Sequence, residues 1–493
     1  MNILLIYPEF PDTFWSFKHA LKFVGKRAAL PPLGLLTVAA QLPPEWPVRL
    51  VDTNAQKLKE KDLKWADCAF ISAMTVQREP ARRIAARLKA AGVRVVAGGP
   101  LFTSEHEQFE DVDHFVLNEA ELTLPPFLED LARGRAKRVY SSGEFAEMEN
   151  SPPPRWELLN LKRYASMSIQ FSRGCPFNCD FCNITALLGK RFRIKSSRQI
   201  IAELDVLYDR GWRGDVFFVD DNFIGNKQFL KIDLLPALID WRKGKSGNIF
   251  FTEASINLAD DQELMDMMAA AGFSKVFIGI ETPDNVCLAE CGKGQNEERD
   301  LVEDVKRLHR SGLQVQGGFI VGFDHDQPSI FQRQIDFIQK TGIVTAMVGL
   351  LQAPAGTRLY ERLKKEGRLR DEDFSGDNVD GTTNIIPTMS LDALKTGYRQ
   401  ILDHIYSPEH FYRRLRTFLT EYKTPSVRGH LEFSHILALA RSFYRLGIIG
   451  RERFHYWKLL IWTQFHCPRL LPEAVILSIY GYHFRRVCRA HVR

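Results

Sequence analysis

Three cysteines in one short stretch are the residues whose types and spacing point most directly to chemistry. Cys175, Cys179 and Cys182 lie in the segment SRGCPFNCDFCNI with the spacing C-x3-C-x2-C. A four-iron, four-sulfur (4Fe–4S) cluster needs one ligand for each iron, so three thiolates leave one iron open to a ligand that is not protein. A zinc loop would need a fourth Cys or His at a paired spacing, and none follows at a suitable distance. We therefore interpret the loop as an iron–sulfur site, with a zinc loop and chance clustering as the alternatives.

The residues around these cysteines add a family resemblance. Arg173 and Gly174 precede the motif, and the aromatic Phe181 stands just before its last cysteine. The segment resembles the signature of the radical S-adenosylmethionine (SAM) superfamily. The resemblance implies that the open iron binds the amino and carboxylate groups of SAM. It also implies that the cluster takes an electron from a donor such as flavodoxin or ferredoxin. The reduced cluster then splits SAM into methionine and a 5'-deoxyadenosyl radical.

Composition favours an intracellular enzyme of two or three domains. The chain has 493 residues, of which 45% are apolar, and only 8 cysteines, too few for a disulfide framework. We expect the scattered cysteines, including the pair Cys287 and Cys291, to be buried thiols. No signal peptide is visible in MNILLIYPEF, and no apolar run reaches the length of a membrane span. The expected location is the cytoplasm.

Residues 1–140 alternate between strand-like and helix-like segments, which predicts a Rossmann-like parallel α/β sheet. Strands are expected at residues 2–7, 48–52, 68–73, 94–97 and 114–117, with the clearest helix at 79–91. Ligands of such sheets bind at the carboxyl ends of the strands. The loops expected there contain Ser72, Thr75, Gly98 and Gly99, and the two glycines allow a ligand to approach the backbone.

Before a radical SAM loop, this layout resembles a cobalamin-binding domain. The resemblance implies that Ser72, Thr75, Gly98 and Gly99 line the slot for the nucleotide tail of cobalamin. The D-x-H-x-x-G motif that supplies an axial histidine in many cobalamin proteins is missing, and His19, the only histidine in the first loop, has neighbours that do not match. A Rossmann-like domain that binds no corrin is the alternative.

A linker and a second α/β domain follow. Residues 141–165 contain the run Ser151-Pro152-Pro153-Pro154, which neither a helix nor a central strand accommodates. Residues 166–387 show six βα units, which fit the partial TIM-type barrel of the superfamily. Strands are expected at 168–172, 216–219, 249–252, 276–280, 316–321 and 346–350, and helices at 197–210, 262–271, 296–311 and 329–340.

Polar residues and glycines at the predicted strand ends complete the candidate site. They match places where the superfamily binds SAM, and each alone is a weak signal. The resemblance implies SAM contacts at Phe181, Asp220, Asp221, Asn222, Glu253, Ser255, Glu281, Ile320 and Gly322. No general acid or base is expected.

The C-terminal region, residues 388–493, is predicted to be helical. From Phe411 onward it contains fifteen Lys/Arg against four Asp/Glu, interleaved with aromatic residues. Such basic, aromatic helices lie in a membrane interface, or they pack their apolar face on the barrel and leave the arginines in solvent. Both alternatives stay open here. No nucleic-acid partner is expected, because no RNA-binding module is recognisable.

Shared phrases relate the whole chain to one branch of a family. PPLGLL, FFVDDNFIGN, GIETP and EGRL resemble the hopanoid C-2 methylase-like branch of cobalamin-binding (class B) radical SAM enzymes. This resemblance implies cobalamin-dependent methylation of an unactivated carbon in a lipid- or isoprenoid-like substrate. The alternatives are radical SAM oxidation, cyclisation or rearrangement without methyl transfer, and a non-catalytic cluster protein.

Overall fold

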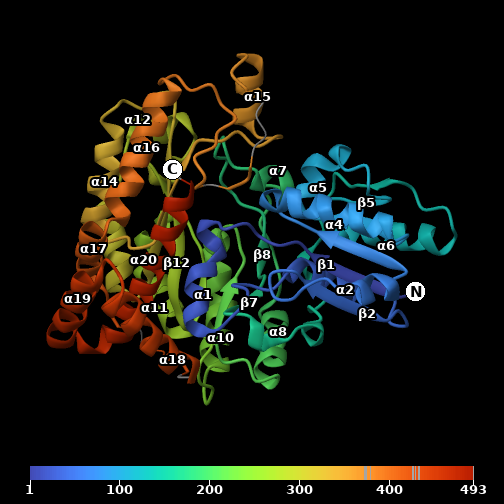
Figure 1. The fold of residues 1–493 in the computed structure, drawn as a ribbon, viewed down its shortest axis with the longest axis horizontal. Coiled ribbons are helices and arrows are strands. Elements are labelled where there is room, and N and C mark those ends of the chain that lie inside the picture. Colours follow the sequence, from blue (N-terminus) through green and yellow to red (C-terminus); the bar gives the residue numbers. More distant parts are fainter. Residues whose placement is uncertain (371–374, 378, 425–426, 428, 431–432, 492–493) are drawn as a thin grey trace.

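The computed structural model describes residues 1–370, 375–377, 379–424, 427, 429–430 and 433–491. Two parallel sheets, each flanked by helices, lie side by side, and a group of C-terminal helices packs on the far side of the second sheet (Figure 1). The N-terminal sheet occupies the right of this view and the C-terminal helices the left. The predicted α/β fold class is confirmed.

The first sheet has six parallel strands in the order β2-β1-β3-β4-β5-β6. Its central strands bury both faces, as apolar runs such as ILLIY and CAFIS require. The five predicted strands are present, and a sixth, β6, was not expected. The strands are β1 (Ile3–Tyr7), β2 (Val48–Asp52), β3 (Cys68–Ser72), β4 (Arg94–Gly98), β5 (His114–Val116) and β6 (Val139–Tyr140). The main helices are α2 (Leu33–Gln41), α3 (Glu60–Trp65), α4 (Arg78–Ala90), α5 (Pro100–Glu105) and α6 (Ala120–Ala132).

The second sheet is also parallel and curves into a partial barrel, in the order β14-β13-β12-β11-β10-β7. Its strands are β7 (Ser166–Ile169), β10 (Asp215–Phe218), β11 (Phe250–Glu253), β12 (Phe273–Glu281), β13 (Gln314–Val321) and β14 (Ala346–Leu350). The outer helices include α8 (Ser197–Asp209), α10 (Leu235–Trp241), α11 (Gln262–Ala271), α13 (Leu301–Arg310) and α14 (Ile330–Thr341). Each of the six predicted strands overlaps an observed one.

One helix boundary in this domain was wrong. The helix predicted at 296–311 begins only at Leu301, after a separate 3-10 turn at Gly294–Asn296. The side chain of Asp300 accepts a hydrogen bond from the backbone N–H of Glu303, which makes Asp300 the N-cap. The residues before the helix therefore follow a separate path, and Gln295 among them approaches the cysteine loop.

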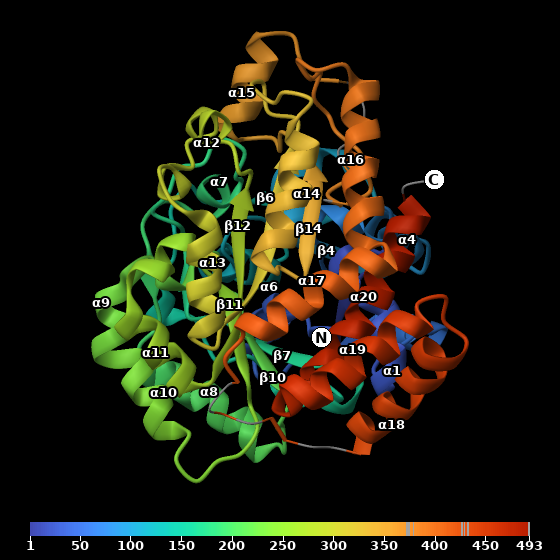
Figure 2. The ribbon, with the colours of Figure 1, turned by 90° about the vertical axis from the view of Figure 1, so that its left-hand side faces the viewer.

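The C-terminal region is helical, as predicted. It contains α16 (Leu391–Tyr406), α17 (Pro408–Glu421), α18 (Phe433–Ser442), α19 (Arg453–His466) and α20 (Leu471–His491), of which α16 and α17 pack against α14 (Figure 2). Among the residues that the structure describes, no helix combines the length and apolarity needed to cross a bilayer.

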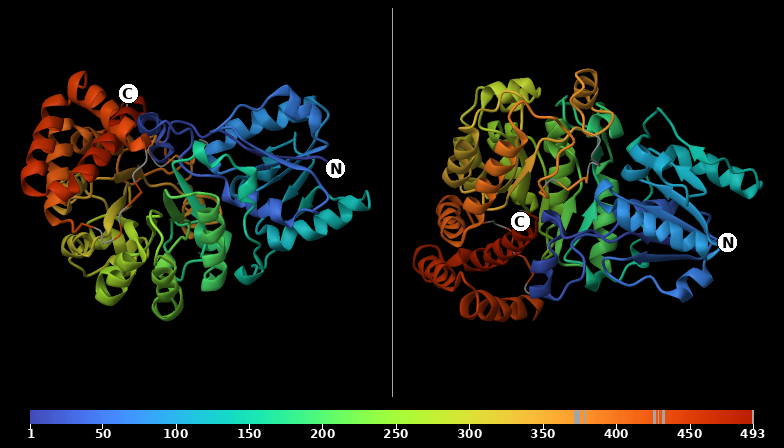
Figure 3. Two further views of the ribbon diagram at one scale, coloured as in Figure 1. Left: turned by 90° about the horizontal axis from the view of Figure 1, so that it is seen from below. Right: turned by 45° about the horizontal axis from the view of Figure 1, so that its top comes forward.

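An N-terminal strap crosses from the first sheet to these C-terminal helices (Figure 3). It comprises the 3-10 turn Phe14–Ser16 and α1 (Lys18–Val24). The rings of Phe14 and Phe484 stack with centroids 4.0 Å apart, and the Nε2 atom of His483 lies 2.9 Å from the carbonyl oxygen of Phe14. Arg441 donates to the carbonyl of Phe23. The strap therefore joins opposite ends of the chain.

Candidate active site

The three cysteines lie in a loop that leaves the edge of the barrel. The loop is enclosed by a short antiparallel hairpin, β8 (Ser172–Arg173) with β9 (Arg193–Ile194), and by α7 (Ile184–Leu188). Gly174, which starts the turn, has φ of 90°, and a Cβ there would lie 2.5 Å from the carbonyl oxygen of Arg191. A glycine is therefore required directly before Cys175.

The thiols are arranged to act as thiolates once metal is present. Burial raises the pKa of Cys175, and it raises the pKa of Cys182 to about 12. The backbone N–H groups of Phe177 and Ile184 donate hydrogen bonds to these two sulfur atoms. These hydrogen bonds lower the two pKa values and so partly offset the effect of burial. Hydrogen bonds to sulfur of this kind tune iron–sulfur clusters. The loop therefore offers three sulfur ligands with supporting amide donors.

The loop supplies three of the ligands that a cluster needs. In a 4Fe–4S cluster each thiolate binds a different iron, and Cys175, Cys179 and Cys182 are three free thiols on one loop. In the described part of the chain, no three His, Cys, Asp or Glu side chains gather closely enough to hold one ion.

Neighbouring segments fix the cysteine loop from outside. Arg358 donates to the carbonyl of Asn178 at 2.5 Å and pairs with the carboxylate of Asp180. Asp180 also accepts from the backbone of Leu359 at 3.0 Å. Gln295 reaches Cys179, with Nε2 3.9 Å from Sγ. The segment QAPAGTRLY, residues 352–360, thus anchors this loop.

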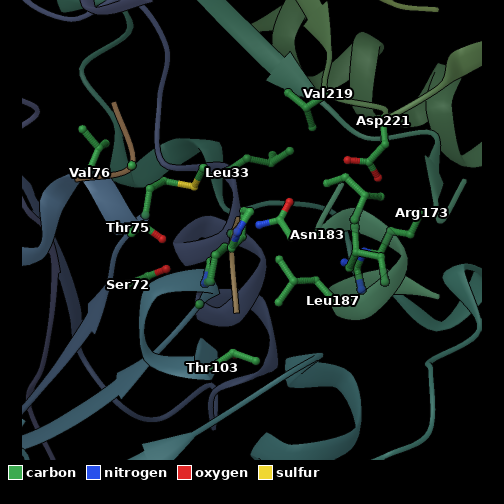
Figure 4. A pocket seen from close by; sticks show the side chains of 18 of the residues that line it. Leu33, Ser72, Thr75, Val76, Thr103, Arg173, Asn183, Leu187, Val219 and Asp221 are labelled. Atoms are coloured by element: carbon green, nitrogen blue, oxygen red, sulfur yellow. The ribbon is translucent and has the colours of Figure 1, made fainter. Parts of the chain in front are cut away.

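A cavity of about 810 Å³ lies between the first sheet and the barrel mouth. Residues from both domains line it: Ser72 and Thr75 project from one side, and Arg173 and Asp221 from the other (Figure 4). The predicted site residues in its wall are Ser72, Thr75, Gly98, Gly99, Phe181, Cys182, Asp221, Glu281 and Ile320. The fold therefore brings together residues that the sequence placed in two separate sites.

Two adjacent glycines form a close-fitting slot in the first domain's half of the cavity. Gly99 has φ of 90°, and a Cβ there would lie 2.6 Å from the hydroxyl oxygen of Ser72. A Cβ on Gly98 would lie 2.5 Å from the carbonyl oxygen of Val116. The slot has no room for side chains at these positions, so a ligand can approach the backbone directly. This cradle fits the nucleotide tail expected from the resemblance.

The three polar residues after β10 have different roles. Asp220 is buried and accepts hydrogen bonds from the backbone and hydroxyl of Ser172, which fixes the strand that leads into the cysteine loop. The Oδ1 atom of Asn222 accepts from the backbone and hydroxyl of Ser255. Asp221 alone lines the cavity, and its Oδ2 atom is buried without a hydrogen-bond partner. Its position suits a polar or cationic group of a ligand.

These carboxyl groups make one end of the site acidic. Burial raises the pKa of Asp220 to about 7 and that of Asp221 to about 6. Burial, followed by repulsion from Asp221 and Asp220, raises the pKa of Glu253 to about 8. Bringing a cation near them would favour the charged forms. Glu253 does not line the cavity wall but lies behind it, beside the two aspartates.

Glu281 has a strained backbone in the cavity wall. Its φ is 63° and it stands at a β-bulge where β12 meets β13. Its Oε1 atom is 2.7 Å from the Nζ atom of Lys293. Burial alone would lower the pKa of Lys293, but the Glu281 carboxylate and the Cys179 thiol raise it. Backbone strain of this kind persists where the surroundings impose it, often at functional sites.

Gly322 and His19 lie away from the cavity. Gly322 donates its N–H to Asp326 at 2.7 Å, at the end of β13. His19 lies on the N-terminal strap, 3.6 Å from Asp12, and packs near His483. None of the described residues that line the cavity is a histidine. His19, the histidine of the first loop, is therefore not at the Gly98–Gly99 slot.

Sequence reasoning missed an ion-pair cluster between the two domains. Glu119 and Glu121, after β5, face Arg173 and Arg193 from the cysteine hairpin. The Glu119–Arg193 pair is almost fully buried. Glu119 and Arg193 are 74 positions apart, so no local sequence pattern connects them. Glu119 does stand just after the strand predicted at 114–117. We call these four residues the interdomain clamp.

The floor of the cavity is apolar, and the strap packs against two of the residues that form it. The Nε1 atom of Trp15 donates to the sulfur of Met347 at 2.9 Å, and its ring meets Phe277 edge-on with centroids 5.5 Å apart. Phe277 and Met347 both line the cavity. The strap therefore helps to close the barrel under the candidate site.

Comparison with known proteins assigns these parts to families. The B12 binding domain model matches residues 27–128, and the Radical SAM superfamily model matches residues 169–338. Residues 357–493 match a domain of unknown function (DUF4070). The expected pairing of a cobalamin-binding domain with a radical SAM domain is thereby confirmed.

Two relatives align over almost the whole chain. An uncharacterized methyltransferase of Synechocystis sp. is 41% identical, with 98% of this chain and 91% of that protein covered. The hopanoid C-2 methylase of Rhodopseudomonas palustris is 33% identical, with 93% and 89% covered. The chain belongs to the cobalamin-binding radical SAM methyltransferase family, in the branch that contains the hopanoid C-2 methylase.

Solved structures share the fold at low sequence identity. The radical enzyme OxsB, with aqua-cobalamin and SAM bound, matches with a TM-score of 0.63 and 14% identity, covering 99% of this chain and 80% of that one. The methyltransferase TsrM from Kitasatospora setae, with cobalamin and a 4Fe–4S cluster bound, matches with a TM-score of 0.56 and 16% identity, covering 76% and 80%.

Proposed function

We propose that this enzyme transfers a methyl group to an unactivated carbon of a lipid- or isoprenoid-like substrate. The observation that carries the proposal is the single cavity whose wall contains both Cys182 and the Gly98–Gly99 slot. Groups held at these two places face the same cavity, so a substrate between them is within reach of both. Positioning of this kind is the main contribution of a protein whose cofactors supply the reactive chemistry.

Each part of the site has a proposed task. Cys175, Cys179 and Cys182 hold the cluster, and Ser72, Thr75, Gly98 and Gly99 hold cobalamin. SAM is bound by Phe181, Asp221, Glu281 and Ile320 in the cavity wall, while Asp220, Asn222, Glu253 and Ser255 shape that wall from behind. When bound, the cluster would supply the electron that cleaves SAM to a 5'-deoxyadenosyl radical, and cobalamin would supply the methyl group. The required electron comes from a small donor such as flavodoxin or ferredoxin.

The cavity floor supports a lipid-like substrate. Phe277 and Met347 present an aromatic ring and a thioether, and Trp15 closes the floor behind them. Burying hydrocarbon there is favourable, by about 25 cal/mol per Å² removed from water. The hopanoid C-2 methylase relative is named for a lipid of this chemical kind. We therefore place the methyl acceptor above this floor.

Turnover of the reconstituted enzyme tests the proposal. Protein loaded with iron, sulfide and hydroxocobalamin is incubated with reductant, an isoprenoid lipid extract and SAM carrying a deuterated methyl group. The proposal expects S-adenosylhomocysteine, 5'-deoxyadenosine and label in the lipid fraction. Formation of 5'-deoxyadenosine alone would instead support oxidation, cyclisation or rearrangement.

A cysteine variant provides the control for the cluster. Cys175→Ala/Cys179→Ala/Cys182→Ala is expected to lose both bound iron and SAM cleavage. Cys467→Ala, which changes a thiol between α19 and α20, is expected to retain both. Unchanged iron content and SAM cleavage in the triple variant would overturn the assignment of the loop.

A further inference from the structure

The helices α18 and α19 expose an unusual number of large apolar side chains. Ten of the nineteen exposed large apolar residues in the described chain fall between residues 436 and 465. We call this group the apolar face. It consists of Ile436, Leu437, Leu439, Tyr444, Ile448, Ile449, Phe454, Trp457, Ile461 and Phe465. Scattered exposed apolar residues are normal on protein surfaces, but a concentration of them marks an interaction site.

The helix α19 shows that this exposure follows the helix geometry. Phe454, Trp457, Ile461 and Phe465 recur at three- and four-residue spacing and therefore share one side of the helix. Phe454 is 73% exposed and Phe465 is 80% exposed. The opposite side, with Leu459 fully buried, packs on α17 and α20. The helix is apolar on both sides, but Phe454, Ile461 and Phe465 stay largely exposed in the described chain.

The turn before α19 extends the same face. Residues 443–448 form a π-helical turn that ends α18, and the exposed Ile448 and Ile449 stand at the tip of the resulting hairpin. Trp457 fixes this tip, because its Nε1 atom donates to the carbonyl of Gly447 at 2.9 Å. The exposed residues of the tip and of α19 therefore belong to one defined hairpin.

The charges around the apolar face are of one sign. Between residues 433 and 470 there are six Lys/Arg and a single acidic residue, Glu452. Glu452 is buried and pairs with Arg485 at 2.7 Å, so it does not offset the cations. The exposed cations are Arg441, Arg445, Arg451, Arg453, Lys458 and Arg469. The hairpin thus carries exposed aromatic and aliphatic groups and, in the same stretch of chain, six exposed cations, which we call the basic rim.

We infer that this hairpin docks on the surface of an anionic lipid bilayer. Aromatic and aliphatic side chains enter the interfacial region, and a basic rim pairs with acidic headgroups. A second copy of the chain is a poorer occupant, because it would bring a second basic rim against the first. Inward packing, one of the two alternatives expected for the C-terminal region, is seen for α17 and α20. Contact of α18 and α19 with a membrane, the other alternative, is what we propose here. The inference does not depend on the proposed substrate, since it concerns adsorption and not turnover.

Vesicle binding tests this inference directly. The full chain is sedimented with vesicles of phosphatidylcholine alone and with vesicles that also contain phosphatidylglycerol. Binding is expected to be at least tenfold stronger on the anionic vesicles and to weaken as salt is raised. Arg453→Gln/Lys458→Gln is expected to weaken it by about fivefold for each charge removed.

Apolar variants separate insertion from simple charge attraction. Phe454→Ser/Ile461→Ser/Phe465→Ser is expected to lose at least tenfold in vesicle affinity. The matched control Ile232→Ser changes an equally exposed side chain elsewhere (71% exposed) and should bind as the wild type does. Because all four side chains are largely exposed, circular dichroism and thermal unfolding should show the variants folded.

The fluorescence of Trp457 can show how deeply the hairpin enters the bilayer. Brominated lipids should quench part of the wild-type tryptophan fluorescence, and Trp457→Phe should remove that part. The inference is overturned if anionic vesicles do not bind the protein. It is also overturned if Phe465→Ser abolishes a dimer seen by sedimentation velocity while vesicle binding is absent, since the face would then serve self-association.

Discussion

The carboxylate of Glu119 accepts two parallel hydrogen bonds from the guanidinium group of Arg193, with Oε1 2.6 Å from Nη2 and Oε2 2.8 Å from Nη1. The pair is buried and joins the end of β5 in the cobalamin-binding domain to the hairpin that encloses the cysteines. Arg173 binds the same carboxylate at 3.2 Å and also reaches Glu121. The relative position of the two half-sites therefore depends on a few charges.

Breaking this clamp should destabilise the cofactor-free protein strongly. Glu119→Gln leaves buried guanidinium charge uncompensated, and removing one partner of a buried pair costs about 3–5 kcal/mol. Urea unfolding measures the loss. The control Glu129→Gln removes an exposed partner of Arg133 and should cost less than about 1 kcal/mol. Equal midpoints for Glu119→Gln and wild type would show that the clamp contributes no net stability.

Adding one methyl group to the glycine slot should weaken cobalamin binding. In Gly99→Ala the new Cβ displaces the hydroxyl of Ser72, and we expect at least a tenfold loss of affinity, measured from the absorption of hydroxocobalamin. Gly92→Ala has the same kind of backbone strain, at φ of 73°, but its Cβ points into open space. If both variants bound equally well, the slot would not be the cobalamin site.

Removing the charge of Lys293 should lower the cluster's reduction potential. The Nζ atom pairs with Glu281 and acts electrostatically on Cys179 and Cys182. A nearby cation stabilises the more negative, reduced state, so Lys293→Gln should shift the midpoint downward by tens of millivolts, where about 59 mV is tenfold for one electron. Redox titration followed by electron paramagnetic resonance measures it. Lys340→Gln, an exposed lysine on α14, should leave the potential unchanged.

The cofactor-free protein should lose stability as the pH rises. The pKa of Glu253 is raised by burial from 4.5 to about 8, so the folded protein keeps a proton that the unfolded chain has released. The resulting stabilisation is complete below about pH 4.5 and is lost as the pH rises towards 8.

Glu253→Gln should remove this dependence, because the amide carries no titrating proton. The fall in Tm between pH 5.5 and 8.5 is then smaller than in wild type, by roughly 2–4 °C for each kcal/mol recovered. Differential scanning calorimetry without SAM measures both. A variant of the exposed Glu149 to Gln should follow the wild-type curve, and an identical pH dependence for Glu253→Gln would contradict the expectation.

The sheets could be predicted from sequence because their signal is local. Apolar runs such as those of β1 and β14 are buried on both faces, and each lies close to its predicted limits. The cysteine motif is equally local. The domain limits at 140, 165 and 387 remain predictions, and the strap shows that residues 14–24 pack outside the first domain.

The finer arrangement of the site depends on contacts that no local pattern records. Asp220, Asp221 and Asn222 are adjacent and equally polar, yet only Asp221 lines the cavity, because Ser172 and Ser255 bind its neighbours. The direction of each side chain is set by a turn and by residues 33–49 positions away. The clamp and Trp15 were missed for the same reason.

The strap also has a consequence for the order in which the chain is assembled. Phe14 stacks on Phe484 of the last helix, so its binding place does not exist until nearly the whole chain has been synthesised. Domains that emerge from the ribosome fold from the N-terminus onward. The first sheet can therefore form early, whereas the strap can pack only after the last helix has been made. The floor of the cavity, with Trp15, is therefore among the last parts of the molecule to be completed.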